Sequence, residues 1–170
     1  MSNSKQFCVN KDFTYVYIDG VWDLFHPSHL KFIERVREHA TKELDPSVVK
    51  IIAGVISDSD AKLYKRLPIM NESQRARMIE SCSLVDFVVR NSPLLISEEF
   101  LNTYNITLTY HGNDSNQSDF FKVPIEKNMM RYVKYDDEIS TTTIISNLKL
   151  FGLNFTNYFV KFLIMLTRLI

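Results

Sequence analysis

The sequence is poor in cysteine, and it carries no excess charge of either sign. Its 2 cysteines, Cys8 and Cys82, lie far apart and have no companions for a disulfide framework or a metal knuckle. A reducing compartment is therefore expected. Lys plus Arg and Asp plus Glu both number 20, so no global field indicates nucleic acid as a partner. No internal repeat or low-complexity run appears.

Long hydrophobic runs are also scarce. The first ten residues lack the apolar run of a signal peptide, and the apolar stretch between Lys161 and Arg168 is too short to span a bilayer. We therefore expect a cytoplasmic protein. Residues 148–170 carry three cations and no acid, which suits an interfacial helix at the endoplasmic reticulum membrane. A helix packed on the domain or in a dimer interface fits equally well.

The composition and the order of segments indicate a globular α/β domain. Hydrophobic residues make up 45% of the chain and charged residues 24%, as in ordinary globular proteins. Apolar, β-branched runs predict strands at 15–18, 48–57, 84–90, 106–110 and 131–134, separated by helices that start near Pro27, Asn71, Ser97 and Ser140. Residues 58–66 are predicted to be a polar loop.

This alternation predicts a Rossmann-like, open and mostly parallel sheet with helices on both faces, plus a C-terminal hydrophobic helix. We divide the chain into an N-terminal arm at 1–12, a nucleotide-binding domain at 13–147 and a tail at 148–170.

The stretch from Tyr15 to Leu30 contains the most informative pattern. A strand ends at Asp19-Gly20, and a helix opens at Pro27. Because His26 and His29 are three residues apart, both rings can lie on one face of the helix start, where backbone amides point outward. The pattern predicts a phosphate site at the carboxyl edge of the sheet. Two unrelated surface histidines remain the alternative, because H-x-x-H is a weak pattern.

At these residues the chain resembles a known family. D-G-x-x-D-x-x-H-x-x-H is similar to the nucleotidyltransferases with an HxGH signature, most closely the cytidylyltransferases that act on phosphocholine and phosphoethanolamine. I-A-G-V-I-S-D at 52–58, P-I-M-N-E-S-Q-R at 68–75, V-D-F-V-V-R-N-S-P at 85–93 and S-T-T-T at 140–143 resemble further family segments in the same order. The resemblance covers about residues 14–147.

Three departures from the family pattern stand out. Ser28 replaces the glycine between the histidines, and Arg66 replaces the glycine that usually follows the lysine. Residues 135–138, Y-D-D-E, stand where the family has R-T-x-G. Acids thus replace a phosphate-binding arginine, which exchanges attraction for repulsion. Either another cation substitutes, Lys134 or Arg131 being nearest, or activity is weakened. A catalytically weak or inactive regulatory module is therefore the alternative function.

The resemblance implies roles for individual residues. His26 and His29 would stabilise the transition state, and Lys65 would neutralise phosphate charge. Residues implied in nucleotide binding are Asp19, Gly20, Asp23, Arg75, Ser140, Thr141 and Thr142. Magnesium would accompany CTP and be carried mostly by its phosphates, so no metal site held by the protein alone is expected. We also expect a homodimer.

The choice of acceptor depends on a different set of residues. H-G-N-D at 111–114 resembles the phosphoethanolamine enzymes, whereas residues 90–93 and 97–101 look more like the choline enzymes. The residues implied in acceptor binding are Trp22, Tyr110, His111, Asn113 and Asp114; the two aromatic ones could cage a quaternary ammonium or equally belong to the core. The implied reaction transfers cytidylyl from CTP to phosphoethanolamine, or to phosphocholine, and releases pyrophosphate. A transferase that uses ATP or glycerol phosphate fits less well.

Overall fold

The structure, a computed structural model, describes residues 8–113, 118–136 and 138–152. The chain forms two compact units, Met1–Asp136 and Asp137–Ile170, and each is described by itself. The division into an arm, a nucleotide-binding domain and a tail stays a prediction. Most of the predicted tail lies outside the described residues, so its interfacial helix stays a prediction. Within the described residues, no helix has the length and apolar character needed to cross a membrane.

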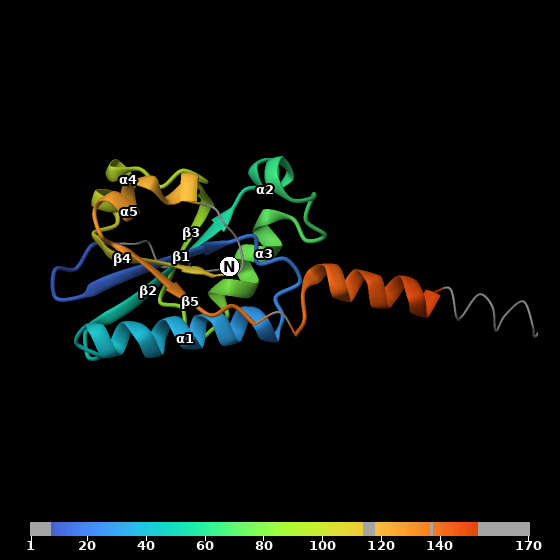
Figure 1. The fold of residues 1–170 in the computed structure, drawn as a ribbon, viewed down its shortest axis with the longest axis horizontal. Helices are drawn as coiled ribbons and strands as arrows, with labels where there is room; N and C mark the ends of the chain where they lie inside the picture. The colour runs from blue at the N-terminus through green and yellow to red at the C-terminus, as the bar shows by residue number, and fades with distance from the viewer. Residues whose placement is uncertain (1–7, 114–117, 137, 153–170) are drawn as a thin grey trace, which may run out of the picture. The chain divides into compact units, whose positions relative to one another are not determined.

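The first unit is built on a parallel sheet of five strands in the order β3-β2-β1-β4-β5 (Figure 1). The strands are β1 (Thr14–Gly20), β2 (Val49–Ile56), β3 (Phe87–Ser92), β4 (Ile106–Gly112) and β5 (Met130–Val133). Central β1 pairs with β2 from Thr14↔Val49 to Gly20↔Val55 and with β4 on its other side. The strand order reverses at β1, so the loops that follow the neighbouring strands run in opposite directions. Sheets of this class bind ligands in the crevice that forms at such a reversal, beyond the carboxyl ends of the strands. The predicted parallel sheet is confirmed.

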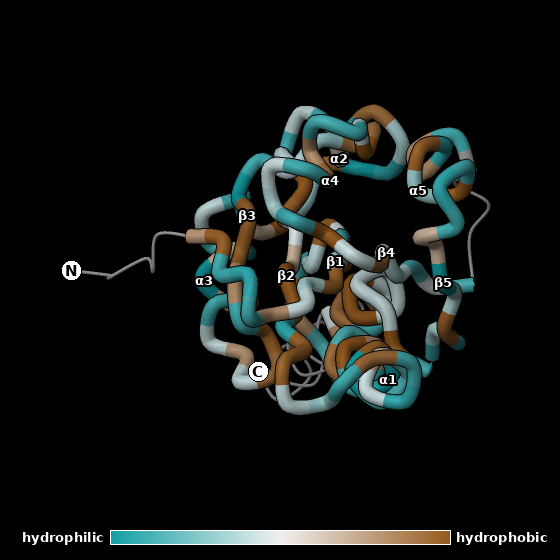
Figure 2. Tube along the Cα trace, turned by 90° about the vertical axis from the view of Figure 1, so that its left-hand side faces the viewer, coloured by the Kyte–Doolittle hydropathy of each residue, from teal (hydrophilic) through white to brown (hydrophobic). Residues whose placement is uncertain are grey.

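Helices cover both faces of the sheet, as predicted (Figures 1 and 2). One face carries α1 (Pro27–Glu43) and α3 (Glu72–Glu80), and the other carries α4 (Glu98–Thr103), the 3₁₀ helix η1 (Ser118–Phe121) and α5 (Lys122–Glu126). In β1, Val16 and Ile18 pack toward α1 and α3, while Tyr15 and Tyr17 pack toward α4 and η1. This period of two places one apolar cluster on each side of the sheet.

The sequence missed one helix. Residues 58–66 were predicted to be a loop, but α2 (Asp58–Tyr64) occupies most of this stretch. The Ser57 side chain accepts a hydrogen bond from the Asp60 N–H at 3.0 Å and so caps the helix, and acids in the first turn favour its N-terminal dipole. A serine followed by acids is a recognisable helix start, but the many polar residues masked it. The loop prediction was therefore wrong.

A close contact in the core explains the glycine of β2. Gly54 lies beside the buried hydroxyls of Tyr17 and Ser92, which hydrogen-bond to each other. A Cβ at position 54 would lie 2.1 Å from the Tyr17 hydroxyl and 2.6 Å from the Ser92 hydroxyl. Burial raises the pKa of Tyr17, so the hydroxyl stays protonated and can donate in this pair. The backbone of β2 can approach the pair only without a side chain.

Gly54→Ala is expected to lower the free energy of unfolding by about 1–3 kcal/mol, because the added methyl group overpacks the core. Urea denaturation measures this change. Gly152→Ala is the matched control: a Cβ there meets nothing within 4 Å, so it should leave stability unchanged or raise it by up to about 1 kcal/mol. An equal response of both variants would contradict the packing argument.

Candidate active site

The turn from β1 to α1 is held in a conformation that few residues adopt. Trp22 and Leu24 have φ values of 56° and 50°, and left-handed backbone costs a non-glycine residue about 1–2 kcal/mol. The Trp22 indole N–H donates to the Gly54 carbonyl at 2.8 Å, which ties the turn to β2. Gly20 is explained by the same ring, since a Cβ there would lie 3.0 Å from the indole. The turn is therefore fixed by packing and hydrogen bonds before any ligand binds.

The two histidines lie together at the start of α1. Their ring centroids are 3.8 Å apart with an interplanar angle of 24°. His26 is 6% exposed, and His29 is half-buried between the Phe25 ring, stacked at 5.7 Å, and the Trp22 ring, edge-on at 5.3 Å. The spacing in the sequence predicted that the rings would meet, but it did not indicate Phe25, whose position directly before His26 was the available signal.

Burial sets the charge state of this pair. Burial, together with His26 and Lys65, lowers the pKa of His29 to about 3, and burial also lowers the pKa of His26. The His29 Nδ1 accepts a hydrogen bond from the His26 backbone N–H at 3.3 Å. A neutral ring that accepts at Nδ1 carries its proton on Nε2. His29 is thus a neutral imidazole with an N–H to donate.

Asp23 organises the loop opposite the histidines. Its buried carboxylate accepts hydrogen bonds from the backbone N–H groups of Ile69 and Met70 and from the Arg66 guanidinium, each at 3.0 Å. Burial raises the pKa of Asp23, but these hydrogen bonds outweigh burial and hold it below its usual value. The side chain fastens the loop before α3 to the β1–α1 turn, so its contacts are those of a positioning residue.

Asp19 and Lys65 lie on the side of the sheet toward α2. Burial raises the pKa of Asp19 to about 7, and the nearby charge of Lys65 opposes this shift. The same lysine lowers the pKa of His29, so one cation acts on both groups. Lys65 follows directly on the last residue of α2. The predicted lysine therefore lies close enough for its charge to act on His29.

Arg75 was predicted to bind nucleotide, but its contacts argue against that role. The side chain is 0% exposed. Its guanidinium donates to the carbonyls of Val21, Ile56 and Met70 and to the carboxylate of Asp58. Nearly all its donors are thus used within the protein. The arginine joins the ends of β1 and β2 to the loop before α3.

The predicted acceptor residues that the structure describes do not gather at one place. Trp22 and Tyr110 are buried in the core, and the Tyr110 hydroxyl contacts His39 at 3.1 Å, about 15 Å along α1 from His29. Tyr110 therefore lies too far from the histidines to hold an acceptor there. His111, at the end of β4, packs on Phe121 at 5.0 Å.

Two further predicted residues lie near the end of β4. The Asn113 side chain accepts a hydrogen bond from the Tyr135 N–H at 3.2 Å, which gives it a contact within the protein. Asp114 lies outside the described residues, so its role in acceptor binding stays a prediction.

Tyr135 and Asp136, the first two residues of the acidic segment that stands in place of R-T-x-G, belong to the first unit. The Tyr135 ring lies 6.5 Å from His29 and 6.0 Å from Phe32. Asp136 forms ion pairs with Lys31 at 3.2 Å and Arg35 at 3.3 Å, both on α1. These ion pairs hold the pKa of Asp136 below its usual range. The repulsion expected from this carboxylate is therefore offset by two cations.

The predicted Ser140, Thr141 and Thr142 belong to the second unit. There the Ser140 hydroxyl accepts a hydrogen bond from the Thr143 N–H at 3.1 Å, at the start of a helix over residues 141–152. The predicted helix start is confirmed. Because this unit is described by itself, the role of these residues in nucleotide binding stays a prediction.

Comparisons with known proteins identify the family of the chain. The family model described as cytidylyltransferase-like matches residues 17–147. The chain belongs to the cytidylyltransferase-like family. The matched residues include the end of β1, the histidine pair and the loop that carries Lys65, so the family identified from sequence motifs is confirmed.

Relatives of both acceptor classes match the chain about equally well. It is 30% identical over 139 residues to the ethanolamine-phosphate cytidylyltransferase of Arabidopsis thaliana, covering 76% of this chain and 31% of that protein. It is 32% identical over 137 residues to the human choline-phosphate cytidylyltransferase A, covering 78% and 36%. The chain thus spans about a third of the length of these relatives.

The fold of this chain is similar to that of a solved structure. That structure is the lipopolysaccharide core biosynthesis protein from Thermoplasma volcanium, with a TM-score of 0.52, 19% identity, and coverage of 72% of this chain and 98% of that one. At this identity the likeness concerns the fold alone.

The pKa of His29 can be tested directly. Because the folded chain protonates His29 near pH 3 and the unfolded chain near pH 6.5, acid favours unfolding, and this contribution to stability grows as pH rises through that interval. Nitrogen-15 NMR should therefore find a neutral ring with its proton on Nε2 from about pH 7 to about pH 5. The same ring in urea is the control. A midpoint near 6.5 in the folded protein would contradict the burial argument.

Proposed function

We propose that the chain transfers cytidylyl from CTP to phosphoethanolamine, or to phosphocholine, and releases pyrophosphate. In this scheme a phosphate oxygen of the acceptor attacks the α-phosphorus of CTP in line, and no covalent intermediate with the protein forms. Catalysis then consists mainly of positioning and of stabilising charge that develops on the phosphates. The single observation that carries the proposal is the close pair of imidazoles, the buried His26 and the half-buried His29, at the start of α1.

The charge state of these imidazoles suits the proposed chemistry. Two protonated rings 3.8 Å apart would repel each other, whereas neutral rings can both lie close to an incoming phosphate. The Nε2 N–H of His29 can donate a hydrogen bond to a phosphate oxygen as negative charge develops there. Lys65, whose charge acts on His29, supplies the formal positive charge. A preorganised donor beside a cation is the arrangement that stabilises such a transition state.

Asp19 supports an acceptor with a positive charge. Its buried carboxylate is 9% exposed, and the raised pKa reflects the lack of a fully compensating cation. An ammonium group would supply that cation together with N–H donors. This favours ethanolamine, because a quaternary ammonium has no N–H and is best held by an aromatic cage. We therefore assign Asp19 to the acceptor, although the sequence suggested the nucleotide.

Magnesium is expected to enter with CTP. It keeps several water and phosphate ligands and needs few from a protein. Within the described residues there is no group of three His, Cys, Asp or Glu side chains that could hold a metal ion. Asp23 already accepts three hydrogen bonds, which leaves it poorly suited as a ligand. In this proposal magnesium binds as part of the CTP complex.

A catalytically weak or inactive regulatory module remains the second candidate. The observation that favours it is the Y-D-D-E segment at 135–138, which lacks the arginine and threonine of the family. Such a module would bind CTP and form no product. A homodimer and contact of the tail with a membrane are also proposals, and either function is compatible with them.

Product formation from radiolabelled CTP with each acceptor tests the proposal. His26→Ala and His29→Ala are each expected to lower kcat by on the order of 10²–10³, as for the loss of one transition-state donor. His39→Ala is the matched control, because His39 lies on the same helix beside Tyr110. Tight CTP binding without product in the unmodified chain would favour the regulatory module.

Asp19→Asn separates the acceptor role from the nucleotide role. We expect the KM for phosphoethanolamine to rise by roughly tenfold or more, because a charged hydrogen bond is lost, and the KM for CTP to stay unchanged. In the unmodified chain the acceptor KM should fall as pH rises through about 7, where Asp19 ionises. A rise in the KM for CTP alone would return Asp19 to the nucleotide.

A further inference from the structure

We propose that Arg66 binds the phosphates of the nucleotide and so replaces the arginine missing from residues 135–138. The inference rests on the proposed function, and it concerns a position where the family usually has glycine. An arginine at this position is therefore a feature of this chain and not part of the family pattern. It would contact substrate phosphates beside Lys65, its neighbour in sequence.

The Asp23 carboxylate holds the side chain of Arg66 in place. The Arg66 Nη2 donates to the Asp23 carboxylate at 3.0 Å, and Asp23 lies three residues before His26. The negative charge of Asp23 acts on both imidazoles, raising the pKa of each against the effect of burial. A guanidinium hydrogen-bonded to that carboxylate is therefore at the edge of the histidine site.

Arg66 also keeps donors for a ligand. A guanidinium has five N–H donors. In Arg66 one is used on Asp23 and one on the Leu67 carbonyl at 3.0 Å, and the other three have no partner among the residues that the structure describes. The side chain is 40% exposed, so those donors can reach solvent and a phosphate. Because Asp23 already holds the side chain, less conformational entropy is lost when an anion binds.

Other arginines and lysines of the first unit also have partners within the protein. Arg75 is buried and bound to three carbonyls and Asp58. Lys31 and Arg35 pair with Asp136. Arg131, a candidate from sequence, forms a two-pronged hydrogen bond with Glu43 at the last residue of α1, about 20 Å along that helix from His29.

Lys134 is the remaining rival among the sequence candidates. Its side chain is exposed, and its backbone carbonyl accepts a hydrogen bond from Arg35 at 2.8 Å. Lys134 and Arg66 are therefore compared directly in the experiment.

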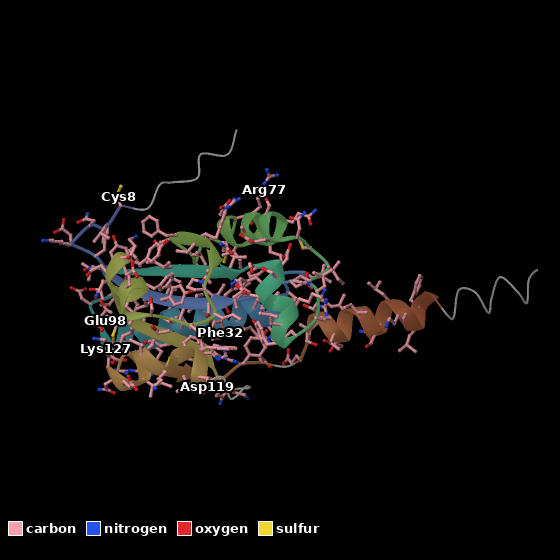
Figure 3. All side chains as sticks on the ribbon, turned by 90° about the horizontal axis from the view of Figure 1, so that it is seen from above. Cys8, Phe32, Arg77, Glu98, Asp119 and Lys127 are labelled. Carbon is pink, nitrogen blue, oxygen red and sulfur yellow. The ribbon has the colours of Figure 1, made fainter. Side chains whose placement is uncertain are left out.

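The test compares CTP, CMP and cytidine binding by calorimetry in the full chain and in Arg66→Ala, Arg66→Lys and Lys134→Ala. Arg66→Ala should weaken CTP binding by roughly 10- to 100-fold, as for lost charge-assisted hydrogen bonds, weaken CMP less and leave cytidine unchanged. Arg66→Lys should retain an intermediate affinity, because it keeps the charge without the planar fork. Arg77→Ala is the matched control: it removes the same charge from α3, where the side chain points away from the protein (Figure 3).

Each outcome separates the inference from the function on which it rests. Unchanged CTP affinity in Arg66→Ala, or a loss in Lys134→Ala alone, overturns the assignment while CTP binding by the unmodified chain keeps the proposed function. A fall in melting temperature with equal weakening of CTP, CMP and cytidine would mean that Arg66 only holds the loop, which also overturns it. Absence of CTP binding in the unmodified chain would instead defeat the proposed function itself.

Discussion

The buried guanidinium of Arg75 is the interaction on which the site depends. It joins the turn after β1, the end of β2 and the loop before α3 through the carbonyls of Val21, Ile56 and Met70. A buried cation is tolerated only while its hydrogen bonds are made, so these segments cannot separate without leaving it unpaired. Asp23 adds a second link between the turn and the same loop. Together they fix the start of α1 relative to the sheet.

At that fixed edge lie the two imidazoles of the proposed phosphate site. Burial lowers the pKa of both His26 and His29, and the stacking of their rings at 3.8 Å is compatible with uncharged imidazoles. The positive charge is carried instead by Lys65 and Arg66, on the loop that Asp23 holds. Donors fixed by the fold require little reorganisation when a phosphate arrives, and the cations lie on residues that solvent can still reach.

The acidic segment at 135–138 departs from the family pattern, yet its first carboxylate is paired with cations of the same unit. Asp136 is neutralised by Lys31 and Arg35 on α1, and Tyr135 packs beside His29. The segment thus contributes packing where the family has a phosphate-binding arginine.

The sequence by itself determined the parallel sheet, the family and the meeting of the two histidines, because strand runs, motif order and a three-residue helical spacing are local signals. It missed α2, whose polar residues masked a capped helix, and it could not foresee that Arg75 would be buried or that Tyr110 would turn toward His39. Those outcomes depend on which side chains meet across the sheet. Only the tertiary structure decided which cationic side chains use their N–H donors within the protein and which keep donors for a ligand. The partners of these donors lie far away in the sequence, so local patterns do not reveal them.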